Sequence, residues 1–165
     1  MSEQPVQEKP VPGRKDNPRV PPPLVMAAVG VPMWLLAQFL PVGQVSVPGQ
    51  APLAILLLVA GILLMLWAVA FFVKVKTTVN PLRPARASSL VTGGAFRLSR
   101  NPIYLGDLLV LAALAVWLGN VFNVALLALF VWYINRFQIL PEERALTGLF
   151  GEEYLDYCRR VRRWL

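Results

Sequence analysis

The sequence predicts an all-α integral membrane protein, with about four transmembrane helices in a bundle and a C-terminal amphipathic helix on the cytoplasmic side. Of its 165 residues, 56% are hydrophobic and only 15% are charged, far from the balance of a soluble domain. The segment Ala51–Val73 contains no charged residue. At ~1.5 Å per residue, a helix of this length crosses a ~30 Å hydrocarbon core. A buried helix of a soluble protein normally shows a polar stripe over such a length, and this one has none.

Three further apolar segments complete the predicted bundle. The first, Leu24–Leu40, contains Pro32, which should kink the helix but which a transmembrane helix tolerates. The others run from about Pro102 to Leu118 and from Val121 to Leu140. Because only Gly119–Asn120 separates them, we expect a tight antiparallel hairpin.

The remaining segments define the domain organisation. Residues 1–22 are rich in proline and mixed charges, which predicts a disordered or extended cytoplasmic arm. Residues 23–165 form one transmembrane domain, of which 77–165 is the part expected to bind a cofactor. The connection before Asn101 is about 25 residues long and rich in Pro, Ser, Thr and Gly, as is typical of a functional loop.

A last helix is predicted after the fourth span. Pro141 suits the first helical position, and Glu142 and Glu143 lie at the positive end of the helix dipole. Gly148 and Gly151 weaken the helix and mark a bend. Apolar residues recur at helical spacing and predict an amphipathic helix on the bundle or the membrane. They are Leu146, Phe150, Tyr154, Tyr157, Val161 and Trp164.

The distribution of basic residues predicts the orientation. They fall in the arm, the central connection and the tail, whereas the 41–50 connection and the Gly119–Asn120 turn carry no charge. The positive-inside rule therefore places both termini and the central connection in the cytoplasm, and we expect the inner membrane of a bacterium. The net charge of +7 then reflects topology and attraction to anionic membrane lipids rather than nucleic-acid binding.

Composition also limits the chemistry. The chain has no histidine and a single cysteine, Cys158, so imidazole acid–base catalysis, a Ser–His triad and a His or Cys metal site are excluded. Any reaction must use carboxylates, tyrosines, arginines or a bound cofactor.

Polar residues gather at the start of the third span, in RLSRNPIYLGD. Asn101 suits a helix N-cap and Pro102 the following position, while Tyr104 and Asp107 share a face. Free N–H groups at this helix start favour an anion. Gly106 allows close approach of a backbone or a ligand.

Structural explanations compete at each of these positions. Asn101 can be only a cap, Tyr104 only an interfacial aromatic residue, and Arg97 and Arg100 only topology charges. Asp107 is harder to explain, because an acid inside a span is costly and has a partner or a task. A purely structural pairing with Arg100 or Arg136 is the alternative to a functional role for Asp107.

A second polar group, Asn135–Glu143, lies at the end of the fourth span. The predicted hairpin brings it close to the first group, which favours a ligand site over simple compensation of the helix dipole. Adjacent glutamates point ~100° apart on a helix, so one can face inward while the other faces outward.

These motifs together resemble the isoprenylcysteine carboxyl methyltransferase family and the related phospholipid N-methyltransferases. The resemblance covers Thr77–Leu165 and rests on the pattern R-[HN]-P-x-Y-x-G, a glutamate pair and F-G-x-x-Y-x-x-Y. The matching residues are Arg100, Asn101, Pro102, Tyr104 and Gly106; Glu142 and Glu143; and Phe150, Gly151, Tyr154 and Tyr157.

The resemblance implies a membrane methyltransferase that uses S-adenosylmethionine and acts on a small or lipid-like acceptor, a carboxylate, an amine or a thiol, with membrane lipids as partners. The implied cofactor-binding residues are Arg100, Asn101, Pro102, Tyr104, Leu105, Gly106, Glu142 and Glu143. The implied catalytic residues are Arg97 and Arg136, which would hold an anionic acceptor, and Asp107. No metal is required.

Two other classes remain open. Membrane sterol reductases resemble this family in their cofactor region and use NADPH, and a bundle without catalysis could serve as a scaffold for partners. Binding of S-adenosylmethionine, of NADPH or of neither separates the three.

Overall fold

The computed structural model of the chain describes residues 20–40, 42–75 and 89–165. Every regular element among these residues is helical, apart from one isolated bridge pair, Gln44 with Asn120. The predicted all-α class is therefore confirmed. Most of the predicted disordered arm (1–19) and residues 76–88 of the central connection lie outside the described residues.

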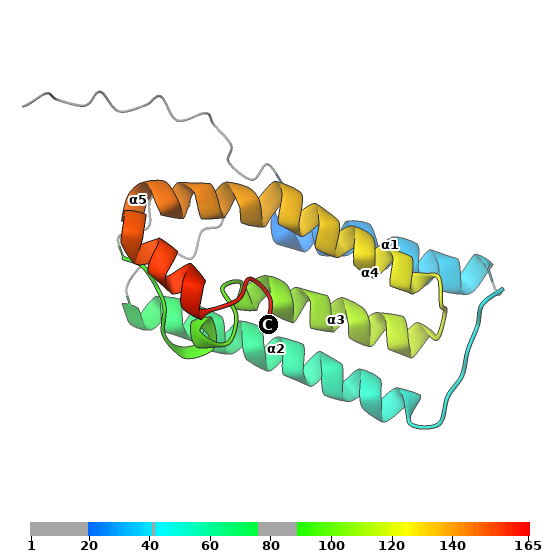
Figure 1. Cartoon of the computed structure of the whole chain (residues 1–165). Coiled ribbons are helices and arrows are strands. Elements are labelled where there is room, and N and C mark those ends of the chain that lie inside the picture. The colour runs from blue at the N-terminus through cyan, green and yellow to red at the C-terminus, as the bar shows by residue number, and fades with distance from the viewer. Residues whose placement is uncertain (1–19, 41, 76–88) are drawn as a thin grey trace, which may run out of the picture.

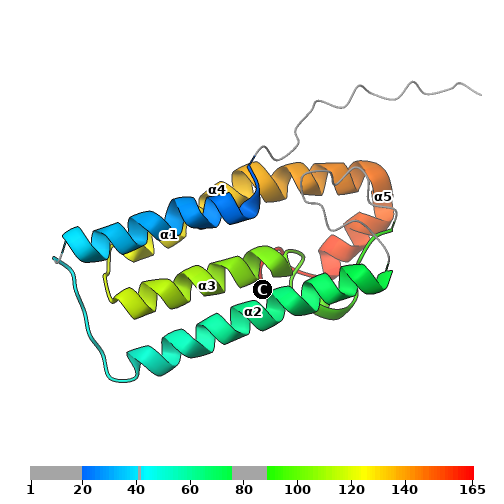
Figure 2. The same ribbon diagram turned by 180° about the vertical axis from the view of Figure 1, so that it is seen from behind.

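Four apolar helices run alongside one another (Figures 1 and 2). They are α1 (Pro22–Phe39), α2 (Gln50–Val75), α3 (Pro102–Leu118) and α4 (Asn123–Ile134). Three helical segments are long and apolar enough to cross a membrane, Pro22–Phe39, Gln50–Lys74 and Asn123–Arg160, and α3 is a shorter apolar helix. Large apolar side chains of α2 face outward, with Leu56, Leu63 and Leu66 each about 60% exposed, as expected for a surface in contact with lipid.

Helices α2 and α3 pack closely through two glycines. A Cβ atom at Gly106 would lie 2.9 Å from the carbonyl oxygen of Gly61 and 2.4 Å from Cγ of Met65, and a Cβ at Gly61 would lie 2.8 Å from the carbonyl oxygen of Gly106. Small residues let transmembrane backbones approach in this way. Of the two expectations for Gly106, the structure therefore realises the close approach of another backbone.

The two ends of the bundle differ in character. At one end, Val45 N donates to Gly119 O over 2.7 Å and Val121 N donates to Gly43 O over 3.1 Å, so the uncharged connections pair with each other. The hairpin predicted between α3 and α4 is confirmed, with α4 starting at Asn123 rather than at Val121. The opposite end, here called the polar end, contains Val20, residues 89–101 and residues 135–165.

The last predicted helix is not a separate element. Helix α4 continues through a π-helical turn, η3 (Asn135–Ile139), directly into α5 (Leu140–Arg160). At Gly151 the backbone adopts φ 52° and ψ −126°, and α5 bends there, so the bend predicted from the glycines is found. Figure 1 shows the last part of α5 turning back toward the start of α3.

The C-terminal helix predicted from the apolar spacing extends too far along the chain. Helix α5 ends at Arg160, and Val161 is extended, with φ −124° and ψ 131°. Tyr154 and Tyr157 are buried against α2 and the short 3-10 helix η2 (Gly94–Arg97), whereas Trp164 packs against the core formed by α1, α3 and α4. The expectation that Trp164 belongs to the helix is therefore wrong, because the chain leaves the helix to reach a second core.

The bend at Gly151 gives a stability prediction with a matched control. A Cβ atom added at Gly148 or at Gly151 would meet only open space, but Gly151 alone of the two has a positive φ. Gly151→Ala should destabilise the protein by about 1–3 kcal/mol, because an L-residue is strained there. Gly148→Ala should be neutral or stabilise by about 0.5–1 kcal/mol, because it removes a glycine from a helix interior. Thermal unfolding in detergent measures both, and equal melting temperatures for the two variants would contradict the assignment.

Candidate functional site

The two polar groups named in the sequence meet at the polar end of the bundle. Arg100, before α3, lies with its Nη2 3.2 Å from Oε1 of Glu143 on α5. Tyr104, in the first turn of α3, donates its hydroxyl to Oε1 of Glu142 over 2.6 Å. The hairpin and the π-helical turn bring these residues together, so the predicted convergence of the two groups is found.

The segment before α3 is fixed by backbone and tyrosine hydrogen bonds. Leu98 N donates to Ala95 O over 3.1 Å and closes η2. The buried hydroxyl of Tyr157 on α5 donates to Phe96 O over 2.7 Å. These bonds hold the segment against the part of α5 that follows the bend, and they set the position of Arg100.

Asn101 and Pro102 start α3 as predicted, but Asn101 does not cap it with its side chain. Its Nδ2 instead donates to the carbonyl oxygen of Arg163 over 3.0 Å, and Ser99 Oγ donates to the same oxygen over 3.2 Å. Arg100 N donates to Arg162 O over 3.0 Å. The side chain of Asn101, expected to help bind an anionic or adenine group of the cofactor, thus faces a backbone carbonyl of the protein instead.

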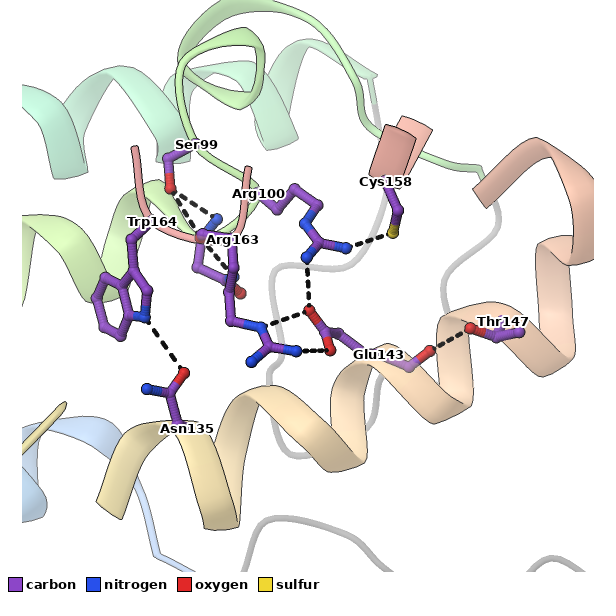
Figure 3. A network of polar contacts seen from close by, with 9 residues as sticks. Ser99, Arg100, Asn135, Glu143, Thr147, Cys158, Arg163 and Trp164 are labelled. Atoms are coloured by element: carbon purple, nitrogen blue, oxygen red, sulfur yellow. Dashed lines mark hydrogen bonds and ion pairs between the residues drawn. The ribbon is translucent and has the colours of Figure 1, made fainter. Parts of the chain in front are cut away.

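Glu143 is surrounded by guanidinium groups, as Figure 3 shows. Arg163 donates from Nε to Oε1 over 3.0 Å and from Nη2 to Oε2 over 2.7 Å, and Arg100 approaches Oε1. The hydrogen bonds to Glu143 raise the pKa of Arg163 above its ordinary value, so this pair stays charged. Arg100 also donates to Sγ of Cys158. With its oxygens occupied, Glu143 serves here as a structural anchor.

Glu142 has a different environment. It is partly buried, and its hydrogen-bond donor is the hydroxyl of Tyr104, which is itself buried. The glutamate pair is not divided between a buried and an exposed side chain, since both residues are partly buried. Both carboxylates find partners within the protein, because Arg163 reaches the side of α5 that sequence reasoning left to solvent.

At the polar end, two buried oxygen acceptors of the described residues lack a hydrogen-bond donor. Asp107 is 4% exposed and its Oδ2 has no hydrogen-bond partner. Gln138, in the π-helical turn, is 1% exposed; its Nε2 donates to Val20 O over 2.7 Å and its Oε1 has no partner. The structural pairing of Asp107 with Arg100 or Arg136 is not found, because Arg100 pairs with Glu143 and the Arg136 side chain is exposed.

The other predicted site residues lie at different depths. Arg97 is exposed at the end of η2, and Arg136 is exposed with its guanidinium 5.7 Å from the ring centre of Phe137. Pro102 and Leu105 are buried in the first turns of α3. The two arginines are therefore exposed at the polar end, whereas Tyr104, Asp107 and Gln138 are buried there and Glu142 is partly buried; these last four residues are here called the buried acceptor group.

Sequence reasoning missed the roles of several residues in this network. It assigns Arg163 to topology, and it places Trp164, whose Nε1 donates to Asn135 Oδ1 over 3.2 Å, in a helix. The segment RRVRRWL does contain a hint of this role. A tryptophan has an apolar ring that packs against the protein and an N–H group that forms a hydrogen bond when it is buried. Ser99 gives no sequence signal beyond its place next to Arg100.

Comparison of the sequence with known proteins identifies proteins similar to this chain. A 63-residue uncharacterized protein of Haemophilus influenzae is 46% identical along its full length, over 38% of this chain. The mouse protein-S-isoprenylcysteine O-methyltransferase is 40% identical over 44% of this chain and 26% of its own length. Arabidopsis thaliana protein-S-isoprenylcysteine O-methyltransferase B is 32% identical over 52% of this chain and 43% of its own length. The chain thus spans less than half the length of these methyltransferases.

No solved structure matches the chain. The family described as phospholipid methyltransferase matches residues 50–153, which is more than half of the sequence and includes α2, α3, α4 and most of α5. The chain belongs to the phospholipid methyltransferase family.

Proposed function

We propose that this chain is an integral membrane methyltransferase that uses S-adenosylmethionine and methylates a small or lipid-like acceptor. Family membership and the similarity to isoprenylcysteine O-methyltransferases support this proposal. The observation that carries it is the buried group of oxygen acceptors at the polar end, where Tyr104 binds Glu142 and where acceptor oxygens of Asp107 and Gln138 are left without donors among the described residues.

These residues fit the cofactor by charge and by hydrogen bonding. S-adenosylmethionine carries a sulfonium and an ammonium group, and both are stabilised by oxygen acceptors. A buried carboxylate without a cationic partner is costly, and a bound cation removes that cost. Glu142 and Gln138 Oε1 would hold the cationic groups of the cofactor, and Tyr104 would orient Glu142.

When bound, the cofactor supplies a methyl group that is already activated for transfer to a nucleophile. The protein then has to align the acceptor and exclude water, which needs neither a histidine nor a metal. For an amine, hydroxyl or thiol acceptor, a proton must also leave, and Asp107, a buried carboxylate, would accept it. Arg97 and Arg136, exposed at the polar end, would bind an anionic part of the acceptor.

An apolar pocket suits the hydrocarbon part of a lipid-like acceptor. It has a volume of about 590 Å³ and lies between α1, α2 and α3, with Gly30, Leu58, Leu114 and Trp117 among its lining residues. The pocket lies among the apolar spans, so a membrane-resident acceptor could enter it from the bilayer without crossing water.

The charge distribution supports a cytoplasmic site. The described arginines of the 89–101 segment and of α5 lie at the polar end, whereas the opposite connections, 42–49 and 119–122, are uncharged. By the positive-inside rule, the polar end with its methyl-transfer site faces the cytoplasm.

Cofactor identity is tested by calorimetric titration of the detergent-purified protein. Wild type should bind S-adenosylmethionine and not NADPH, and Glu142→Ala should weaken binding at least tenfold, because a buried carboxylate that faces the cofactor's cation is lost. Glu153→Ala, which removes an exposed acid farther along the same helix, is the matched control and should bind like wild type. Binding of NADPH would favour a reductase, binding of neither a scaffold, and unchanged affinity in Glu142→Ala would remove the assignment of Glu142.

The role of Asp107 is tested by turnover. Membrane lipid extracts are incubated with enzyme and a methyl-labelled cofactor, and labelled products are measured by mass spectrometry. Asp107→Asn should keep the cofactor affinity within about threefold but lower methyl transfer at least tenfold, because the amide cannot accept a proton. Turnover equal to that of wild type would contradict proton transfer to Asp107 and favour an acceptor that is already anionic.

A further inference from the structure

We infer that residues 161–165, here called the clasp, hold the cofactor site in its binding geometry, with Arg163 as its positioning residue. This inference rests on the proposed function and extends it to a segment that sequence reasoning assigns only to topology. Figure 3 shows Arg163 and Trp164 lying between the segment before α3 and helix α5.

The backbone of the clasp binds the segment before α3. Arg163 O accepts hydrogen bonds from Ser99 Oγ over 3.2 Å and Asn101 Nδ2 over 3.0 Å, and Arg162 O accepts one from Arg100 N over 3.0 Å. Ser99 is fully buried, and its Oγ also accepts from Asn101 N over 3.0 Å. The clasp therefore fixes the backbone immediately before the turn of α3 that carries Tyr104.

The side chains of the clasp bind the other half of the site. Arg163 makes a two-pronged ion pair with Glu143, which is adjacent to the proposed cofactor ligand Glu142. Trp164 Nε1 donates to Asn135 Oδ1 over 3.2 Å, at the start of the π-helical turn that carries Gln138. Two consecutive residues thus contact the residues immediately before α3, the first turn of α5 and the π-helical turn.

The apolar side chains of the clasp fix its own position. Val161 packs with the core that contains Tyr154 and Tyr157, and Trp164 packs with the separate core that contains Tyr104. Because the clasp is anchored on both sides, Arg163 is held at a defined distance from Glu143. A guanidinium has the planar geometry for this pairing, which a lysine ammonium lacks.

Loss of Arg163 has a specific expected consequence. Glu143 would keep only the contact from Arg100, and its side chain is only 17% exposed, so water cannot fully replace the lost donors. Arg100 would then be drawn toward Glu143, and the start of α3 would shift with it. Tyr104 and Glu142 would lose their alignment, although the apolar bundle that makes most of the fold is untouched.

Titration of S-adenosylmethionine into full-length protein in detergent tests this inference. Arg163→Gln should raise the Kd at least tenfold, and Arg163→Lys should give an intermediate value because it keeps the charge without the paired geometry. Arg160→Gln is the matched control: this side chain is exposed, it lies at the end of α5 outside the clasp, and the charge change is identical. It should bind like wild type.

The stoichiometry of binding separates positioning from folding. A partly unfolded variant loses binding sites but keeps the wild-type Kd in the sites that remain, whereas a misaligned site keeps the stoichiometry and raises the Kd. An Arg163→Gln variant with the Kd of Arg160→Gln, at either stoichiometry, overturns the inference. If wild type itself binds no S-adenosylmethionine, the proposed function fails, and the role of the clasp fails with it. If wild type binds the cofactor and Arg163→Gln binds it equally well, only the role of the clasp fails.

Discussion

The ion pairs of Glu143 organise the end of the molecule at which its polar chemistry collects. Within a bilayer the helices gain little by hiding apolar surface from lipid, so their polar ends must be joined by specific bonds. Arg100 from the α3 start and Arg163 from beyond α5 meet on this one carboxylate. The segment before α3, helix α5 and residues 161–165 take up defined positions because this charge is satisfied by both guanidinium groups.

The same constraint divides the glutamate pair between two tasks. Consecutive residues on a helix point ~100° apart, so Glu142 and Glu143 cannot address the same partner. Glu143 faces donors and is neutralised by arginines, whereas Glu142 faces a tyrosine in a region rich in acceptors. A cationic ligand would therefore be stabilised beside Glu142 and not beside Glu143, whose charge the arginines already neutralise. The partition of charge therefore supports Glu142, rather than Glu143, as the residue of the proposed site that faces a cation.

The sequence predicts the elements well and their local partners less well. The spans follow from apolar length, and the bend follows from Gly151. Asn101 shows the limit: an amide before a proline is typical of a cap, yet its partner is a carbonyl far along the chain. The π-helical turn, which adds a residue inside a regular apolar pattern, leaves no signal in periodicity. Trp164 continues the helical spacing of the stripe, so only tertiary packing reveals that it has left the helix.

The bend at Gly151 connects these observations to the position of the site. A straight α5 would carry Tyr154, Tyr157 and everything after them away from the bundle, and Arg163 could not reach Glu143. With a backbone conformation that favours glycine, the chain reverses, Tyr157 reaches Phe96 O, and the arginines return to the start of α3. The polar end is thus closed by a segment remote in sequence from α3, and this closure depends on the backbone conformation of Gly151.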